Sequence, residues 1–186
     1  MKTLIVYSSF SGNNEMLALE LQIMLNCNIL RINEIRKRTG LSIFLDIFFN
    51  RTPRIEYHED KIMDYDHVIL IAPVWAAKIA TPLKSFLLRE KNNIRFYSFI
   101  TACGGGNQDQ KTKIENELTK LVGKTPAVVT ELSISELLRS NQKANIKNVS
   151  GYQLKTNDLA FFAPKIKDHV KLTQGEPFQS NVLNEA

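Results

Sequence analysis

The chain has 186 residues, of which 44% are hydrophobic and 23% are charged, and its formal net charge is +5 at pH 7. This length fits one domain with a sizeable core, and this composition excludes wholesale disorder, a collagen and a coiled coil. The two cysteines, Cys27 and Cys103, have no paired spacing. A disulfide scaffold and a four-cysteine zinc site are therefore excluded.

The N-terminal residues do not resemble a targeting segment. Residues 4–7 are apolar but too few for the core of a signal peptide, and residues 8–14 are polar. No stretch approaches the roughly 20 apolar residues that a membrane span needs. We therefore expect a soluble, cytoplasmic protein without a membrane span.

Basic residues form two clusters along the sequence. They are Arg36, Lys37, Arg38, Arg51 and Arg54, and then Lys165, Lys167 and Lys171. Such clusters are either solvated faces or a means of attracting a phosphorylated or acidic ligand. Nucleic-acid binding is disfavoured, because no interleaving of aromatic and basic residues accompanies the charge.

Short apolar runs alternate with helical patterns along the chain. Strands are predicted at residues 4–7, 28–32, 67–72, 94–101 and 127–132, and helices at residues 12–25, 81–88, 108–121 and 158–170. Thr81 is a candidate N-cap, since Pro82 then falls in the first turn of its helix. Strands separated by helices pair in parallel through right-handed crossovers. The pattern predicts an α/β fold, a three-layer, doubly wound, five-stranded parallel sheet.

We expect one domain over residues 1–172 and a flexible polar tail over residues 173–186. Residues 134–157 are interpreted as an irregular connection. Residues 41–49 are apolar nearly all round, which fits burial on more than one side. This segment packs on its own domain, forms a subunit interface of a homo-oligomer, or covers a bound ligand.

Ligands of doubly wound sheets bind beyond the carboxyl ends of the strands, here after Tyr7, Ala72 and Thr101. The first loop, residues 8–15, places hydroxyls, carboxamides and a glycine at the start of a helix. Such a loop suits a phosphate held by neutral donors. It is also compatible with an ordinary helix start that is capped by Ser11 or Asn13.

The second and third loops carry an aromatic residue and a glycine run. Trp75 is the only tryptophan, and its position between Pro73 and Pro82 indicates a planar ligand that stacks on it. The three glycines at 104–106 either let the backbone approach a ligand closely or form a flexible turn.

These residues carry a family resemblance. Residues 9–15, Ser-Phe-Ser-Gly-Asn-Asn-Glu, resemble the flavodoxin phosphate loop, and residues 64–69, 73–76 and 82–87 resemble the second block of short flavodoxin-like oxidoreductases. The resemblance covers about residues 1–133. It implies a flavodoxin-like sheet with strand order 2-1-3-4-5 and a non-covalently bound flavin mononucleotide (FMN).

The resemblance also assigns three groups of cofactor-binding residues. The phosphate would be held by Ser9, Phe10, Ser11, Gly12, Asn13 and Asn14. The flavin ring would be lined by Pro73, Val74, Trp75, Ala76, Ala77 and Lys78. Its pyrimidine end would be bordered by Thr101, Ala102, Cys103, Gly104 and Gly105.

Two positions depart from the family pattern. Asn14 replaces the usual threonine, although its amide can also donate a hydrogen bond. Ala77 stands where many relatives have glycine, and a positive φ there would cost an alanine about 1–2 kcal/mol.

The resemblance implies an oxidoreductase that passes electrons from NADH or NADPH through FMN to a quinone-like or other small acceptor. The alternative is a flavodoxin-type electron carrier that serves protein partners. Such carriers are typically acidic, so the positive net charge favours the enzyme. No side chain in the three loops is an obvious acid or base, so no catalytic residue is nominated.

The remaining candidates for chemistry are assigned structural places. His58, His67 and His169 share no metal-ligand spacing, so no metal site is predicted and we expect histidines at the surface or boundary. Cys27 is expected in the core, and Cys103 either beside the flavin or simply buried.

Overall fold

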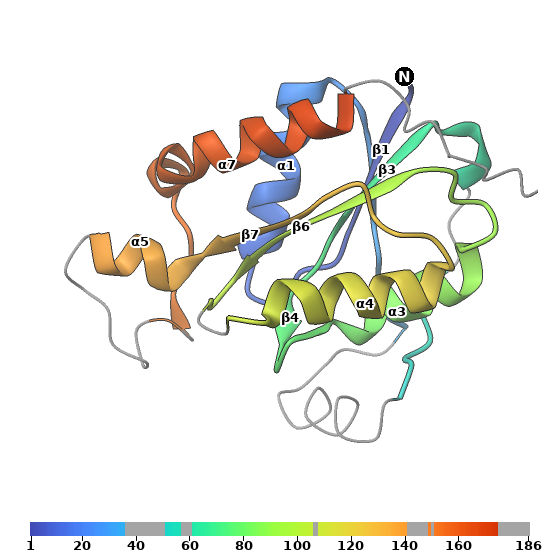
Figure 1. Ribbon diagram of the computed structural model, residues 1–186, viewed down its shortest axis with the longest axis horizontal. Helices are drawn as coiled ribbons and strands as arrows, with labels where there is room; N and C mark the ends of the chain where they lie inside the picture. Colours follow the sequence, from blue (N-terminus) through green and yellow to red (C-terminus); the bar gives the residue numbers. More distant parts are fainter. Residues whose placement is uncertain (36–50, 57–60, 106–107, 141–148, 150, 175–186) are drawn as a thin grey trace, which may run out of the picture.

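The computed structural model describes residues 1–35, 51–56, 61–105, 108–140, 149 and 151–174. At its centre is a five-stranded sheet in the order β2-β1-β3-β6-β7, with every neighbouring pair parallel (Figure 1). The strands are β1 (Thr3–Tyr7), β2 (Asn28–Arg31), β3 (His67–Ile71), β6 (Tyr97–Cys103) and β7 (Val129–Ser133). This confirms the predicted order 2-1-3-4-5, because β4 (Val74–Trp75) and β5 (Lys78–Ile79) form a separate antiparallel hairpin.

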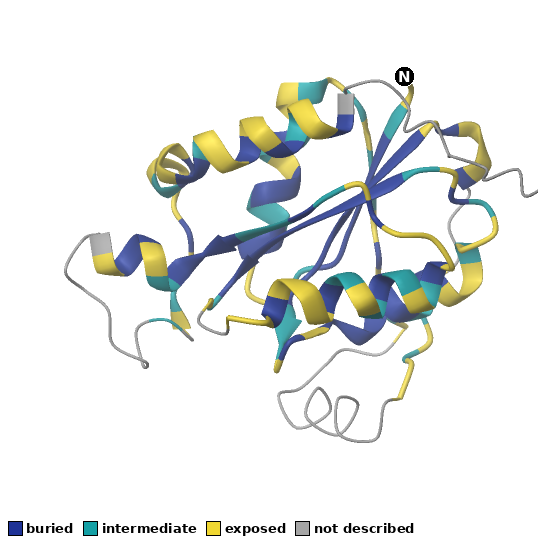
Figure 2. Cartoon of the chain, viewed as in Figure 1, coloured by how far each residue is buried: buried dark blue, intermediate teal, exposed yellow. Residues whose placement is uncertain are grey.

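Helices cover both faces of the sheet and so make the three predicted layers. Helices α1 (Asn13–Leu25) and α7 (Thr156–Gln174) lie on one face, and α3 (Thr81–Glu90) and α4 (Gln110–Val122) lie on the other (Figure 1). Successive side chains of a strand point to opposite faces. Thus Leu4 and Val6 pack in the core with α3 and α4, whereas Ile5 packs with α1 and α7. The central strands are buried on both sides (Figure 2).

Some element boundaries differ from the predictions. Thr81 is the first residue of α3 and not its cap, because Ala80 occupies the N-cap position. Strand β6 begins at Tyr97 rather than at Ile94 and continues to Cys103, whose partner in β7 is Ser133. This extension places Thr101 inside the strand rather than in the loop after it.

The prediction that residues 134–157 are an irregular connection is wrong at its start. Helix α5 (Ile134–Ser140) follows β7 directly. The backbone N–H of Glu136 donates to Ser133 Oγ at 3.3 Å, the bond that a serine makes when it caps a helix. At the other end of the chain, α7 begins two residues before the predicted helix and ends at Gln174.

Other predictions fall on residues outside the described ranges. Residues 41–49 and His58 are among them, and so is the tail beyond Gln174. In the described part of the chain, no helix is both long and apolar enough to cross a membrane.

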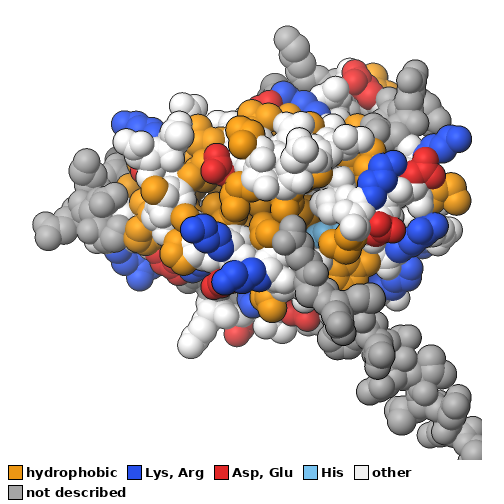
Figure 3. All heavy atoms as spheres, turned by 90° about the horizontal axis from the view of Figure 1, so that it is seen from above, with side chains coloured by type: hydrophobic (Ala, Val, Ile, Leu, Met, Phe, Trp, Pro, Cys, Tyr) orange, Lys and Arg blue, Asp and Glu red, His pale blue; other side chains and the backbone are white. Residues whose placement is uncertain are grey.

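Helix α1 is not clearly amphipathic, since it has apolar residues on its outer side as well as in the core. Leu19, Ile23 and Met24 are exposed on it, and Leu172 is exposed on α7. Figure 3, which views the molecule from the side of α7, shows hydrophobic side chains interspersed with lysines and arginines on this face.

The prediction of surface or boundary positions is wrong for His67 and His169, which are each 1% exposed. Ser98 Oγ lies 3.0 Å from Nε2 of both rings, and Nδ1 of His169 lies 2.9 Å from Thr130 Oγ1. The chain of bonds joins β3, β6, β7 and α7, near the amino ends of the strands. Burial lowers the pKa of His67 from 6.5 to about 4. Burial, and secondarily the charge of His67, lowers the pKa of His169 to about 3.

Because both histidines are neutral in the folded chain, acid should unfold the protein. The contribution of the two histidines to the free energy of unfolding is fully present above pH 6.5. It is lost as the pH falls towards about 4 for His67 and about 3 for His169, because the unfolded chain takes up protons on these side chains at a higher pH than the folded chain does. Each unit of pKa depression is worth about 1.4 kcal/mol. In His67→Gln, which keeps a partner for Ser98, the free energy of unfolding in urea should fall less between about pH 7 and about pH 4.5. An equal loss in wild type and variant would contradict this account.

Candidate functional site

The three predicted loops meet at one edge of the sheet. Strands β1, β3 and β6 are neighbours and parallel, so their carboxyl ends lie side by side. A cleft of about 830 Å³ opens there. From the predicted site it is lined by Phe10, Ser11, Asn13, Asn14, Pro73, Val74, Trp75, Ala76, Ala77, Ala102, Cys103, Gly104 and Gly105.

Four predicted site residues lie outside this lining. Ser9 borders a smaller pocket of about 380 Å³, which shares Phe10 and Trp75 with the cleft. Gly12 lies at the N-terminus of α1, and the side chain of Lys78 is exposed on β5. Thr101 is fully buried in β6, and its hydroxyl donates to the carbonyl of Ala72 at 2.7 Å.

The loop after β1 leaves the N-terminus of α1 without a side-chain cap. Gly12 occupies the N-cap position with φ 93°, so neither Ser11 nor Asn13 caps the helix. Ser9 Oγ accepts a bond of 3.2 Å from the N–H of Gly12. The hydroxyl of Ser8 is buried and has no hydrogen-bond partner within the described residues. Uncapped N–H groups and a helix dipole favour an anion at this place.

The two asparagines of the loop are engaged with the backbone of the protein itself. Asn14 donates to the carbonyl of Ala102 at 3.1 Å and accepts from its N–H at 2.9 Å. Asn13 donates to the carbonyl of Tyr152 and accepts from the N–H of Leu154, both at 2.9 Å. The amide of Asn14 was predicted to donate a hydrogen bond to a ligand. It instead connects the start of α1 to the end of β6.

Trp75 lies on the β4–β5 hairpin, over the middle of the edge. Its half-buried ring meets Phe10 edge to face, with ring centres 6.2 Å apart and planes at 83°. The hairpin is fastened to α4, because Glu117 accepts a bond of 2.8 Å from the N–H of Ile79 and pairs with the ammonium of Lys84.

The hairpin turn holds two alanines in a strained conformation. Ala76 has φ 49° and Ala77 has φ 57°. A two-residue turn with both φ values positive is of type I′, which favours asparagine and glycine. The positive φ considered for Ala77 is thus present, and Ala76 shares it. Each alanine stores strain of about 1–2 kcal/mol.

The glycines after β6 allow close contact with β7 and with the segment that follows α5. A Cβ on Gly105, which has φ 78°, would lie 1.9 Å from Ser133 Oγ. A Cβ on Gly104 would meet Val149 at 3.3 Å. A side chain at Gly105 would therefore collide with β7, and one at Gly104 would press against Val149, which accounts for glycine at these two positions.

Sequence reasoning missed the far wall of the cleft. It is formed by Gln110, Ile134, Ser135, Arg139, Val149 and Tyr152. The spacing Ser133-x-x-Glu136 is a helix-capping pattern and could have revealed α5. By contrast, no local pattern shows that Tyr152 returns to Asn13, which is 139 residues away in sequence.

The cleft is almost free of charge and holds no evident nucleophile. Among the described lining residues only Arg139 carries a charge. Burial, followed by the nearby carboxylate of Glu131, raises the pKa of the Cys103 thiol to about 11. The thiol is therefore protonated at neutral pH and unsuited to nucleophilic attack. No metal-binding group of histidine, cysteine, aspartate or glutamate occurs within the described ranges.

This architecture is that of a doubly wound α/β domain whose ligand cleft lies at the carboxyl edge of the sheet. No family model and no curated protein matches the chain. A flavoprotein from Lactobacillus acidophilus NCFM, solved in complex with FMN, is similar at 19% identity and a TM-score of 0.61, over 77% of this chain and 99% of that one. The chain therefore has the flavodoxin-like fold.

Two further structures support the same fold. The apo form of the Lactobacillus acidophilus flavoprotein has 20% identity and a TM-score of 0.57, over 73% of this chain and 94% of that one. A proposed flavoprotein from Bacteroides eggerthii DSM 20697 has 13% identity and a TM-score of 0.61, over 88% of this chain and 96% of that one.

Relieving the strained turn should stabilise the protein. Ala76 is exposed, so Ala76→Gly loses little burial and should raise the free energy of unfolding by about 1 kcal/mol. The matched control is Ala160→Gly at an exposed position inside α7, which should lower stability by a similar amount. Denaturant titrations measure both, and a destabilised Ala76→Gly would refute the strain.

Proposed function

We propose that the chain binds FMN non-covalently in the cleft. The observation that carries this proposal is the pairing of two neutral recognition elements on one cleft, the uncapped N-terminus of α1 and the indole of Trp75. The first suits a phosphate and the second a planar ring. The fold shared with a flavoprotein in complex with FMN supports the proposal.

The residues present fit such a ligand. Backbone N–H groups at the start of α1 and the hydroxyls of Ser9 and Ser11 would hold the phosphate, while the asparagines keep the loop in shape. Trp75 and its hairpin would lie along the ring. Gly104 and Gly105, which line the cleft, would border the other end of the ring.

Bound FMN would supply one- and two-electron redox chemistry. The protein would bind and orient it and restrict water on the hairpin side. Apart from Arg139, the lining offers no charged side chain, and the Cys103 thiol stays protonated. No residue is therefore assigned as a catalytic acid or base.

We further propose an oxidoreductase that takes electrons from NADH or NADPH and delivers them to a quinone-like or other small acceptor. The net charge of +5 supports this over a flavodoxin-type carrier, which is typically acidic. The cytoplasm as its location belongs to the same proposal, and so do the predicted cofactor-binding residues that line the cleft. The domain is proposed to extend to residue 174 rather than 172, because α7 ends at Gln174 and Thr173 is buried.

Flavin binding is tested by the absorption spectrum of the purified protein. The protein should be yellow as purified, or should retain yellow flavin after incubation with FMN and removal of the free FMN by gel filtration, and it should release FMN on denaturation. A protein that carries no flavin after this treatment would refute the proposal. Steady oxidation of NADH or NADPH with a quinone favours the enzyme, whereas reduction only through a separate reductase favours the carrier.

Replacing the indole of Trp75 tests whether the flavin ring stacks on it. Trp75→Ala should weaken FMN binding by about 1–3 kcal/mol, the range measured for stacking of bases on aromatic side chains. Phe161→Ala is the control, because Phe161 is an exposed aromatic residue on α7 outside the cleft lining. Flavin fluorescence titration measures both, and equal affinities would remove Trp75 from the site.

A further inference from the structure

Arg139 lies at the β7 end of the cleft. It belongs to α5, which follows β7, whereas the phosphate loop follows β1. The first turn of α1 reaches the end of β6, where Asn14 bonds the backbone of Ala102, and β6 is the neighbour of β7. Arg139 is the one charged side chain among the described lining residues of the cleft.

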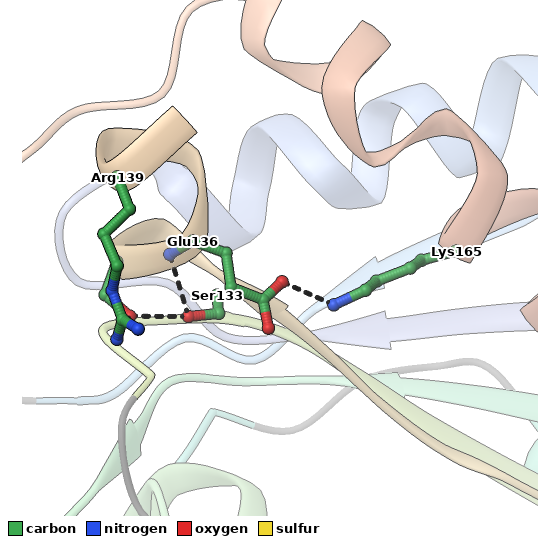
Figure 4. A network of polar contacts seen from close by, with 5 residues as sticks. Ser133, Glu136, Arg139 and Lys165 are labelled. Carbon is green, nitrogen blue, oxygen red and sulfur yellow. Dashed lines mark hydrogen bonds and ion pairs between the residues drawn. The ribbon is translucent and has the colours of Figure 1, made fainter. Parts of the chain in front are cut away.

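The guanidinium of Arg139 has no carboxylate partner within the described residues. Its only bond there is a long one, 3.4 Å, to Ser135 Oγ. The neighbouring carboxylate of Glu136 is paired instead with Lys165 at 2.6 Å. Figure 4 shows Arg139 beside the serine hydroxyls, on the side of Glu136 that faces away from Lys165. An unpaired planar fork of donors suits a phosphate or a carboxylate.

A second cavity continues from this end of the cleft. This β7 groove has a volume of about 730 Å³ and lies beside β7, the edge strand. It shares Gly105, Ser135 and Arg139 with the cleft. The two spaces therefore adjoin at these three residues, and Arg139 borders both of them.

The β7 groove is lined by three basic side chains, Lys111, Arg139 and Lys165, and by three carboxylates. Lys111, in the first turn of α4, has no ion-pair partner within the described residues. The acidic groups there are Glu131, which accepts a bond from Gln110, the paired Glu136, and Asp168. Asp168 lies at the other end, because its neighbour His169 bonds Thr130 near the start of β7.

We propose that the β7 groove is the binding site for the pyrophosphate-bearing part of a nicotinamide dinucleotide, with Arg139 as the residue that holds the pyrophosphate. This inference rests on the proposed function, because the nicotinamide ring must reach the flavin cleft while its phosphates lie elsewhere. The pyrophosphate is common to NADH and NADPH. Lys111 assists from the groove side.

The first test uses ADP as the probe for the pyrophosphate, and adenosine as its phosphate-free counterpart. Isothermal titration of the FMN-loaded protein should show ADP binding about 10- to 100-fold weaker in Arg139→Met, as expected for losing a charge-assisted bond. A smaller loss is expected in Lys111→Met. Lys167→Met removes an equal charge from an exposed position on α7 outside both cavities, and should bind ADP like wild type.

The second test separates binding of the phosphates from transfer of electrons. In Arg139→Met the KM for NADPH should rise by the same factor as the ADP dissociation constant. The rate with a phosphate-free dihydronicotinamide should fall far less than the rate with NADPH, and Lys167→Met should keep both rates.

Equal ADP affinity in wild type and Arg139→Met would overturn the proposal, and so would equal affinity of wild type for ADP and adenosine. A loss of rate with both donors, or a loss of FMN affinity in Arg139→Met, would also overturn it, since Arg139 would then act on the flavin. Failure of the proposed function is seen separately, as absence of FMN binding in the wild type, and the ADP titration can then be made on the flavin-free chain.

Discussion

Burial of the parallel sheet on both faces is the constraint from which the site follows. The side chains of β1 and β3 are withdrawn from water by α1 and α7 on one side and by α3 and α4 on the other. Parallel pairing then brings the carboxyl ends of β1, β3 and β6 to one edge, where backbone groups lack sheet partners. Three segments far apart in sequence become one cleft because their strands are neighbours.

Much of this arrangement could be predicted from the sequence. The apolar run of β3 and the alternation of strands with helices predicted a three-layer parallel sheet, whereas the strand order came from the resemblance to flavodoxins. The glycine and hydroxyl residues after β1 indicated the helix end that faces the cleft. These features are local, because each depends on the residue types within a few positions of one another.

The rest depends on contacts between distant segments. Arg139 enters the cleft only because a short helix follows β7, and Tyr152 only because its carbonyl bonds Asn13. The burial of His67 and His169 was not predicted. A histidine can be buried where hydroxyl groups, here that of Ser98, form hydrogen bonds with its ring nitrogens, and the spacing of residues in the sequence does not reveal such partners. Thr81 has a side chain that could cap a helix, but the N-cap position of α3 is one residue earlier, at Ala80, so Thr81 is already helical.

The bonds of Asn13 and Asn14 have a kinetic consequence. Both side chains tie the turn after β1 to other parts of the domain, to the end of β6 and to residues 152–154. A turn held from two directions has little conformational entropy left to lose when an anion arrives. For the phosphate proposed to bind there, association would be governed by diffusion and by removal of water rather than by ordering of the chain.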